Sequence, residues 1–254
     1  MATASAGQAV VDVREVWKAF DDHPVLRGIS LTLEKGTTLA VMGGSGSGKT
    51  VLLRTIDGLL APDAGEVWLL GTRIDGLREE QLLPLRRRAG YVFQSAALFD
   101  SVSVFENVAF PLREHARLSE GEITERVHRF LSLVGLSADI DDVLPGALSG
   151  GMRKRVGVAR TLVVEPEVVF FDEPTAGLDP TNAKLVAGLI NDLKKGVCDT
   201  SIVVTHDLEF ADAVADRMAI LYQGRFAEVG TPAEIHRSSN RIVRDFLAGE
   251  LRER

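Results

Sequence analysis

Residues 43–50 decide the fold, and they read Gly43-Gly44-Ser45-Gly46-Ser47-Gly48-Lys49-Thr50. They match the phosphate-binding loop pattern G-x-x-x-x-G-K-[ST] at every position. The apolar run 38–42 before the loop is typical of a buried strand, and residues 51–56 after it begin a helix. These parts together form an anion site, because backbone N–H groups and the positive end of the helix dipole face one concavity. A loop that merely turns the chain is the alternative, and the Lys-Thr ending counts against it.

The residues of this loop have separate predicted roles toward a nucleoside triphosphate. The glycines let the backbone approach phosphate oxygens, where a Cβ would block the approach or the required φ. Lys49 is expected to neutralise the β- and γ-phosphates, and the Thr50 hydroxyl to ligate Mg²⁺. The predicted nucleotide contacts here are Gly43, Gly44, Ser45, Gly46, Ser47, Gly48, Lys49, Thr50 and Val51.

Two carboxylates follow an apolar stretch later in the chain. Residues 167–171 are typical of a buried strand, and Asp172 and Glu173 stand at its carboxyl end. Asp172 is therefore predicted to hold Mg²⁺, directly or through water. Glu173 is one residue further on, near the γ-phosphate, and is predicted to polarise an attacking water. Plain solvated charge is the alternative, which the Lys49-Thr50 pair disfavours.

Gln94 and His206 end two further apolar strands, residues 89–94 and 201–205. Ligands of α/β sheets bind at the carboxyl ends of the strands. We therefore predict that Gln94 reaches the metal or a water beside the phosphate, with a solvated loop amide as the alternative. A lone histidine is usually structural, but a place in the same row as Gln94 and Asp172 favours a phosphate contact for His206.

Residues 95–164 have a helical pattern, so this segment is predicted to be an insertion between two parts of one α/β core. Helices are expected over residues 104–110, 120–134 and 150–164. Ser149 is a good N-cap for the last of these helices. Gly150 and Gly151 then leave free backbone N–H groups at a helix N-terminus, which makes a second anion site.

Phe20 ends the first predicted strand, residues 10–20. Its ring can stack on a purine through the π-face. The spacing to the phosphate loop leaves a core or edge position equally open.

Composition and charge exclude several classes of protein. The chain has 254 residues, of which 45% are hydrophobic and 26% charged, and its net charge of −7 gives no general reason to bind nucleic acid. The basic runs 86–88 and 153–155 are most simply solvated helix faces. The single cysteine, Cys198, excludes an internal disulfide. Residues 1–7 lack the features of a signal peptide, and no apolar run is long enough for a membrane span, so a membrane role is expected to need a partner.

The order of these motifs resembles the nucleotide-binding subunit of ABC transporters over residues 10–230. The phosphate loop alone leaves kinases and GTPases open, and the Ser-Gly-Gly helix start with the strand-end histidine excludes them. In this family Gln94 is the Q-loop, residues 148–152 the signature, Asp179 the D-loop and His206 the switch histidine. Phe20 falls where the family stacks an aromatic ring, usually Tyr, on adenine.

The resemblance implies an α/β P-loop NTPase with a RecA-like core, an antiparallel β subdomain and an inserted α-helical subdomain. The expected parts are a nucleotide-binding core over 8–94 and 165–230, a helical signature subdomain over 95–164, and a C-terminal helical tail over 231–254. The tail has an apolar stripe of Ile242, Phe246 and Leu247. This stripe packs against its own domain, or against another copy or a partner.

The resemblance also implies ATP and Mg²⁺ as cofactors. The implied catalytic residues are Glu173, His206, Gln94 and Lys49; the nucleotide contacts add Phe20, Ser149, Gly150, Gly151, Asp172 and Asp179; the metal ligands are Thr50, Gln94 and Asp172. The second anion site follows the first by about 100 residues, so it is not expected to reach its own phosphate loop. In a head-to-tail dimer each signature closes the other copy's site, and losing that link after hydrolysis moves the two copies apart.

Met152 stands where the family's signature usually has Gln. Ser149 and the backbone of Gly151 remain, so catalysis is expected to survive without the Gln side-chain contacts. This Met and the runs 93–99, 104–115 and 241–247 resemble the ATPase of Mla-type systems, which move phospholipids between the membranes of Gram-negative bacteria.

The Mla-type resemblance implies partners and a location. The ATPase is expected to bind a polytopic permease through residues 95–115, where the exposed apolar candidates are Leu98, Phe99, Val102 and Phe105. A small STAS-domain protein and an MCE lipid-binding protein complete the implied assembly. The chain is then peripheral, on the cytoplasmic side of the inner membrane.

Three other functions stay open at this point. The ATPase of a small-solute importer differs only in its partner, because the ATPase does not touch the cargo. A soluble ABC protein of DNA repair or translation usually has two nucleotide domains or a long coiled-coil insertion, and neither is visible in this sequence. A nucleotide-binding regulator without turnover is disfavoured by the intact Lys49, Asp172, Glu173 and His206.

Overall fold

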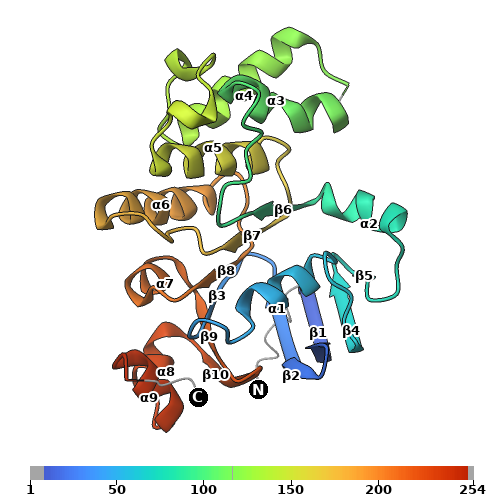
Figure 1. Ribbon diagram of the computed structural model, residues 1–254, viewed down its shortest axis with the longest axis vertical. Coiled ribbons are helices and arrows are strands. Elements are labelled where there is room, and N and C mark those ends of the chain that lie inside the picture. The colour runs from blue at the N-terminus through green and yellow to red at the C-terminus, as the bar shows by residue number, and fades with distance from the viewer. Residues whose placement is uncertain (1–8, 116, 251–254) are drawn as a thin grey trace, which may run out of the picture.

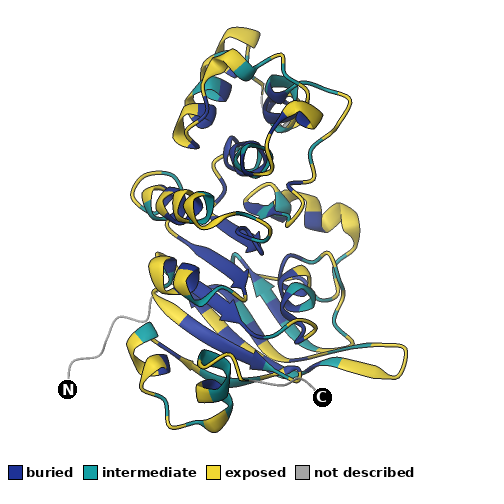
Figure 2. Ribbon diagram, turned by 60° about the vertical axis from the view of Figure 1, so that its left-hand side comes forward, coloured by how far each residue is buried: buried dark blue, intermediate teal, exposed yellow. Residues whose placement is uncertain are grey.

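A six-stranded sheet forms the centre of the computed structural model, which describes residues 9–115 and 117–250 (Figure 1). Its strand order is β10-β9-β3-β8-β7-β6, and all pairs are parallel except β9 with β10. The strands are β3 (Thr38–Met42), β6 (Ala89–Val92), β7 (Val168–Asp172), β8 (Ser201–Thr205), β9 (Arg217–Tyr222) and β10 (Arg225–Gly230). Every residue of β3, β7 and β8 is buried, which explains why their central residues are all apolar (Figure 2).

A second, antiparallel sheet lies beside the first in the order β2-β1-β4-β5 (Figure 1). Its strands are β1 (Ala9–Phe20), β2 (His23–Glu34), β4 (Ala64–Leu69) and β5 (Thr72–Arg73). Alternating residues of β1 and β2 join one apolar cluster with the central sheet and with α1 (Lys49–Ile56). The predicted antiparallel β subdomain is therefore present, and it packs on the helix that follows the phosphate loop.

Three helices gather at one end of the molecule, as Figure 1 shows: α3 (Val104–His115), α4 (Glu120–Leu133) and α5 (Gly150–Leu162). Helix α4 begins at a capping box, in which Ser119 and Glu122 each bind the other's backbone N–H. Its predicted apolar face is buried, and it includes Phe130, which is 0% exposed. The cluster around this face continues onto β7 and the following helix, so an independent helical subdomain over 95–164 stays a prediction.

The remaining helices complete the layers around the central sheet. They are α2 (Glu79–Arg86), α6 (Pro180–Leu193), α7 (Leu208–Val214), α8 (Pro232–His236) and α9 (Arg241–Leu247), with short 3₁₀ turns at Ala138–Ile140 and Pro145–Ala147. The sequence did not predict α7, which has only seven residues and begins at the N-cap Asp207. None of the helices described here is long and apolar enough to cross a membrane.

Two expectations need correction, one about the end of a strand and one about which residues of the tail are buried. The strand predicted to run to Gln94 ends at Val92, because the chain turns through Ala96 and Ala97, which have φ of 64° and 48°. The tail packs on its own domain as one expectation held, but through Ile235 and Val243, both 0% exposed. The predicted stripe is only partly buried beside them. The expected leader, residues 1–7, and residues 251–254 of the tail lie outside the described residues.

Asp57 is a buried carboxylate at the end of α1, and it is only 3% exposed. Its Oδ1 has no hydrogen-bond partner among the described residues, and the nearby Arg86 instead donates to the Gly58 carbonyl at 2.9 Å. Burial raises the pKa of Asp57 from 3.8 to about 7, and Arg86 opposes this rise only in part. The folded protein therefore keeps a proton that the unfolded chain releases at lower pH.

We expect Asp57→Asn to change how stability depends on pH. Between pH 3.8 and about 7 the folded state binds the extra proton, so the free energy of unfolding falls as pH rises through this window. Relative to wild type, the free energy of unfolding of the variant should rise by up to about 4 kcal/mol at pH 8 and by little at pH 4. Urea unfolding of both proteins across this range measures the difference. A difference that stays constant with pH would show that Asp57 is ionised in both states.

Candidate active site

The phosphate loop is a tight backbone cradle between β3 and α1. A Cβ at Gly43 would lie 2.4 Å from the Leu221 carbonyl oxygen and 2.6 Å from Ser47 Oγ. Gly48 caps α1 with a φ of 105°, a conformation that side chains rarely adopt. These positions therefore require glycine, and the anion site at the N-terminus of α1 stays a prediction.

Lys49 is 8% exposed, and it folds back over its own loop. Its Nζ donates to the carbonyl oxygens of Gly43 and Gly44, both at 2.9 Å. The same ammonium lies 3.6 Å from Glu173 Oε1 at the end of β7. The charge predicted to meet phosphate is therefore already fixed between the loop and the predicted base.

Asp172 is only 3% exposed, and two hydroxyls bind its two carboxylate oxygens. Thr50 Oγ1 donates to Oδ1 at 2.8 Å, and the Tyr91 hydroxyl donates to Oδ2 at 2.9 Å. Burial, and next the charge of Asp172, raise the pKa of Tyr91 above its usual range, so the phenol stays a donor. The sequence missed Tyr91, because inside an apolar strand it is indistinguishable from a core aromatic.

The Thr50–Asp172 pair fits Mg²⁺, which prefers oxygen ligands and usually takes only one or two from protein carboxylates. The described residues contain no cluster of three or more His, Cys, Asp or Glu side chains, so the nucleotide's phosphates would have to supply further ligands. Gln94 lies two residues beyond β6 and is exposed, and the structure gives it no contact with this pair. Its predicted metal contact therefore stays a prediction.

Glu173 has a φ of 49°, which is a strained backbone conformation for a residue with a side chain. Its backbone N–H donates to the Val204 carbonyl at 2.9 Å, and its Oε2 lies 2.9 Å from His206 Nδ1. Lys49 and His206 thus approach opposite oxygens of one carboxylate. This arrangement orients Glu173 and leaves His206 Nε2 for another partner.

The start of α5, where the second anion site is predicted, has the expected N-cap. Ser149 is the N-cap, and its Oγ accepts from the Met152 N–H at 3.2 Å. A Cβ at Gly150 would meet no heavy atom within 4 Å, so this helix start is open. Asp179 caps the neighbouring α6, and hydrogen bonds, first that from Asn182, hold the pKa of Asp179 below its usual range.

Phe20 is 44% exposed at the end of β1, so it is not a core residue. Lys18 Nζ lies 5.6 Å from its ring centroid. An edge position and a nucleotide-stacking role both remain consistent with this placement.

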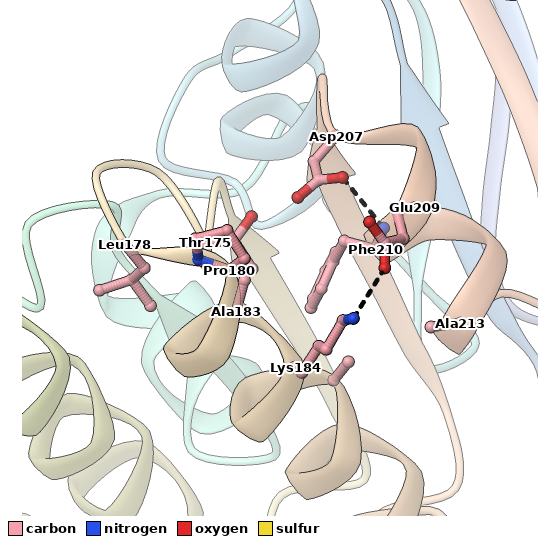
Figure 3. A pocket seen from close by; sticks show the side chains of 10 residues that line it. Thr175, Leu178, Pro180, Ala183, Lys184, Asp207, Glu209, Phe210 and Ala213 are labelled. Atoms are coloured by element: carbon pink, nitrogen blue, oxygen red, sulfur yellow. Dashed lines mark hydrogen bonds and ion pairs between the residues drawn. The ribbon is translucent and has the colours of Figure 1, made fainter.

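A pocket of about 270 Å³ lies between α6 and α7, as Figure 3 shows. Its apolar lining includes Leu178 and Phe210, and the ion pair of Lys184 with Glu209, at 3.3 Å, bridges the two helices. The pocket shares Thr175 and Asp207 with the segments that follow Glu173 and His206, but it is not lined by the phosphate loop. This cavity is therefore separate from the predicted phosphate-loop site.

Comparison with known proteins places these motifs in a family. A sequence profile described as ABC transporter matches residues 26–176, which is more than half of the chain. The chain belongs to the ABC transporter family. It is an ABC ATPase, and the predicted P-loop NTPase fold with an antiparallel β subdomain is confirmed.

Two of its curated relatives differ in what their names describe. The protein TRIGALACTOSYLDIACYLGLYCEROL 3, chloroplastic, of Arabidopsis thaliana is 42% identical over 95% of this chain and 74% of its own length. The methionine import ATP-binding protein MetN of Rhizobium johnstonii is 40% identical over 89% of this chain and 62% of its own length. The chain thus spans 62–74% of the length of these relatives.

The dimeric structure of MJ0796, a bacterial ABC transporter cassette, superposes with a TM-score of 0.82 at 29% identity, covering 87% of this chain and 98% of that one. A dimeric post-hydrolysis state of the same cassette, bound to ADP and Pi, gives a TM-score of 0.81 at 29% identity over the same shares. Binding of ATP by this chain follows from its family.

We expect Tyr91→Phe to weaken the response of the ATPase to Mg²⁺. The variant removes the hydroxyl that fixes one oxygen of Asp172, a hydrogen bond to a charged group worth about 1.5–3 kcal/mol. Part of this energy should appear as an increase of about tenfold in the Mg²⁺ concentration for half-maximal activity, with nucleotide binding retained. A Mg²⁺ titration of ATP hydrolysis measures this, and Tyr222→Phe is the matched control. An unchanged Mg²⁺ titration would contradict a positioning role.

Proposed function

We propose that this chain is the motor subunit of a transporter that moves phospholipid, with Mg²⁺-ATP bound between two copies. The observation that carries a lipid cargo is the 42% identity, over 95% of this chain, with a plant relative that bears the name of a galactolipid. Met152 and the runs 93–99 and 104–115, which resemble Mla-type ATPases, support phospholipid as the lipid class.

The chemistry is assigned to the chain's own residues as follows. Lys49 and the loop N–H groups hold the β- and γ-phosphates, while Thr50 and Asp172 hold Mg²⁺, which would neutralise phosphate charge. Glu173 accepts a proton from the attacking water, because its carboxylate is oriented from two sides. His206 keeps that carboxylate in place through Nδ1 and meets the γ-phosphate through its other ring nitrogen.

The two copies are proposed to face each other head to tail. Among the described residues the start of α5 contacts its own helix and α6, and Ser149 Oγ takes the Met152 N–H, so the N–H groups of Gly150 and Gly151 are proposed to meet a phosphate from another copy. The dimeric cassettes that superpose on this chain support such an arrangement. Ser149, Gly150 and Gly151 of one copy then complete the site of the other.

Phe99 and Phe110 form an exposed aromatic patch in the region proposed to bind the permease. They are 44% and 47% exposed, with ring centroids 5.0 Å apart, and Arg160 lies over the Phe99 ring. Asn107, which is 0% exposed, holds the patch by bonding both the N–H and the carbonyl of Phe99. The backbone that carries the Phe99 ring is therefore fixed.

The structure changes which of the predicted apolar candidates are exposed. Leu98 and Phe105 pack partly buried against the helical core, and Val102 is half-buried, so Phe99 alone of the predicted four is well exposed. Phe110 lies inside the predicted helix 104–110 and was missed because its exposure depends on how α3 packs. We propose the permease as the partner of this patch, with a STAS-domain protein and an MCE protein completing an assembly on the cytoplasmic side of the inner membrane.

A small-solute importer is the second candidate, and the 40% identity with the methionine import protein MetN favours it. The cargo is decided by the membrane partner. Purification of the chain with its natural membrane partners, followed by mass spectrometry of proteins and bound lipid, separates the two. Co-purified phospholipid with an MCE protein supports the first candidate, and a solute-binding protein without lipid supports the second.

We expect Glu173→Gln to bind ATP normally and to lose hydrolysis by about 10²–10⁴-fold, because the water loses its base. The closed two-copy state should then accumulate with ATP, which size-exclusion chromatography detects. Lys49→Ala is the comparison variant, and it should lose nucleotide binding itself. Near wild-type hydrolysis by Glu173→Gln in the assembled complex would contradict the base assignment.

We expect Phe99→Asp to uncouple ATP hydrolysis from the permease. The isolated chain should still fold normally, because the Phe99 ring is already exposed. Co-purification with the permease is the measurement. Leu83→Asp is the matched control, since Leu83 is 48% exposed on α2. Retained co-purification of Phe99→Asp would place the contact elsewhere.

A further inference from the structure

Lys154 connects the signature helix to the segment that follows Glu173. This residue lies on α5, about one turn beyond Ser149. Its half-buried ammonium donates to the carbonyl oxygen of Pro174 at 3.1 Å and to that of Ala176. Burial lowers the pKa of Lys154, and the charge of Glu173 acts in the opposite direction.

These two carbonyls belong to the turn that keeps Glu173 in its strained conformation. The Ala176 N–H donates to the Glu173 carbonyl at 3.1 Å and closes the turn. A φ of 49° at Glu173 costs about 1–3 kcal/mol, and such strain persists only where the surroundings enforce it. Lys154 supplies two of the bonds that hold the peptide groups after Glu173 in place.

A second contact joins the same helix to the D-loop. A Cβ at Gly151 would lie 3.0 Å from Asn182 Oδ1, and Asn182 Nδ2 donates to Asp179 Oδ2 at 2.6 Å. The start of α5 is thus packed against the cap of α6, while Lys154 binds the loop between β7 and α6. The helix and this loop are connected at two places.

We propose that Lys154 is a positioning residue, which holds the turn 173–176 so that the Glu173 carboxylate faces the reacting water. The proposal rests on the proposed role of Glu173 as the base. Helix α5 then has two functions: its N-terminus completes the ATP site of the other copy, and its Lys154 positions Glu173 in its own copy. Closure of the ATP site in one copy therefore constrains the Glu173 carboxylate of the other copy.

The variant Lys154→Met tests this, because it keeps the apolar stem and removes the ammonium. We expect kcat for ATP hydrolysis by the full chain to fall about tenfold or more, with KM and nucleotide affinity changed by less than about twofold. Lys154→Arg, which retains donors, should recover most of kcat. A purely structural role would not separate kcat from KM in this way.

Lys194→Met is the matched control. Lys194 also donates to a backbone carbonyl, that of Val214, and binds Asp216 at 3.1 Å, but on the far end of α6. This variant should lower the melting temperature comparably and leave kcat unchanged. An equal loss of kcat in both variants would overturn the proposal, because it would reflect stability alone.

Glu173→Gln separates failure of this inference from failure of the underlying assignment. If Glu173→Gln is inactive and Lys154→Met has normal kcat, only the positioning role is wrong. If Glu173→Gln keeps normal hydrolysis, both the assignment of Glu173 as the base and the positioning role of Lys154 are wrong. The proposal is supported only when both variants lose kcat and Lys194→Met does not.

Discussion

The parallel pairing of β3, β8 and β7 is the constraint on which the rest of the site depends. Met42 pairs with Thr205, and Val204 pairs with Asp172, so the carboxyl ends of all three strands stop at one edge. Lys49, His206 and Glu173 follow these three ends and meet there within hydrogen-bonding or ion-pair distance. A shift of one residue in this register would turn buried strand residues to the wrong face and separate the three groups.

The second anion site depends on packing between helices instead of strand pairing. Helix α5 is fixed on one side by the apolar cluster that surrounds Phe130, and on the other by α6 and the turn after Glu173. Its N-terminus carries the open Gly150. The same helix also presents Arg160 over Phe99, at the aromatic patch proposed to bind the permease. One element therefore contacts both the turn after Glu173 and the aromatic patch proposed to bind the permease, and it carries the N-terminus proposed to face the second copy.

Much of the fold and the site was predictable from sequence because it depends on local chemistry. The phosphate loop, the strand-end residues Asp172 and Glu173, and the cap Ser149 are each specified by neighbouring residues in the chain. The parts that were missed depend on contacts distant in sequence. Tyr91 binds Asp172 across 81 positions, and Lys154 binds the turn after Glu173 across 20 and 22 positions. The exposure of Phe110 likewise follows only from how α3 packs.

The central claim is that each ATP site is made from two copies, with the loop of one facing Ser149 of the other. Replacing Ser45 and Ser149 with cysteine, in a chain whose own Cys198 is buried, allows the claim to be tested with ATP bound by a short bifunctional thiol-reactive cross-linker, because the intervening nucleotide holds the two sulfurs too far apart for a direct disulfide. The account predicts an ATP-dependent cross-link that doubles the apparent mass on a denaturing gel, and none with either cysteine alone. A cross-link that forms within one chain, leaving the mass of a monomer, would contradict it.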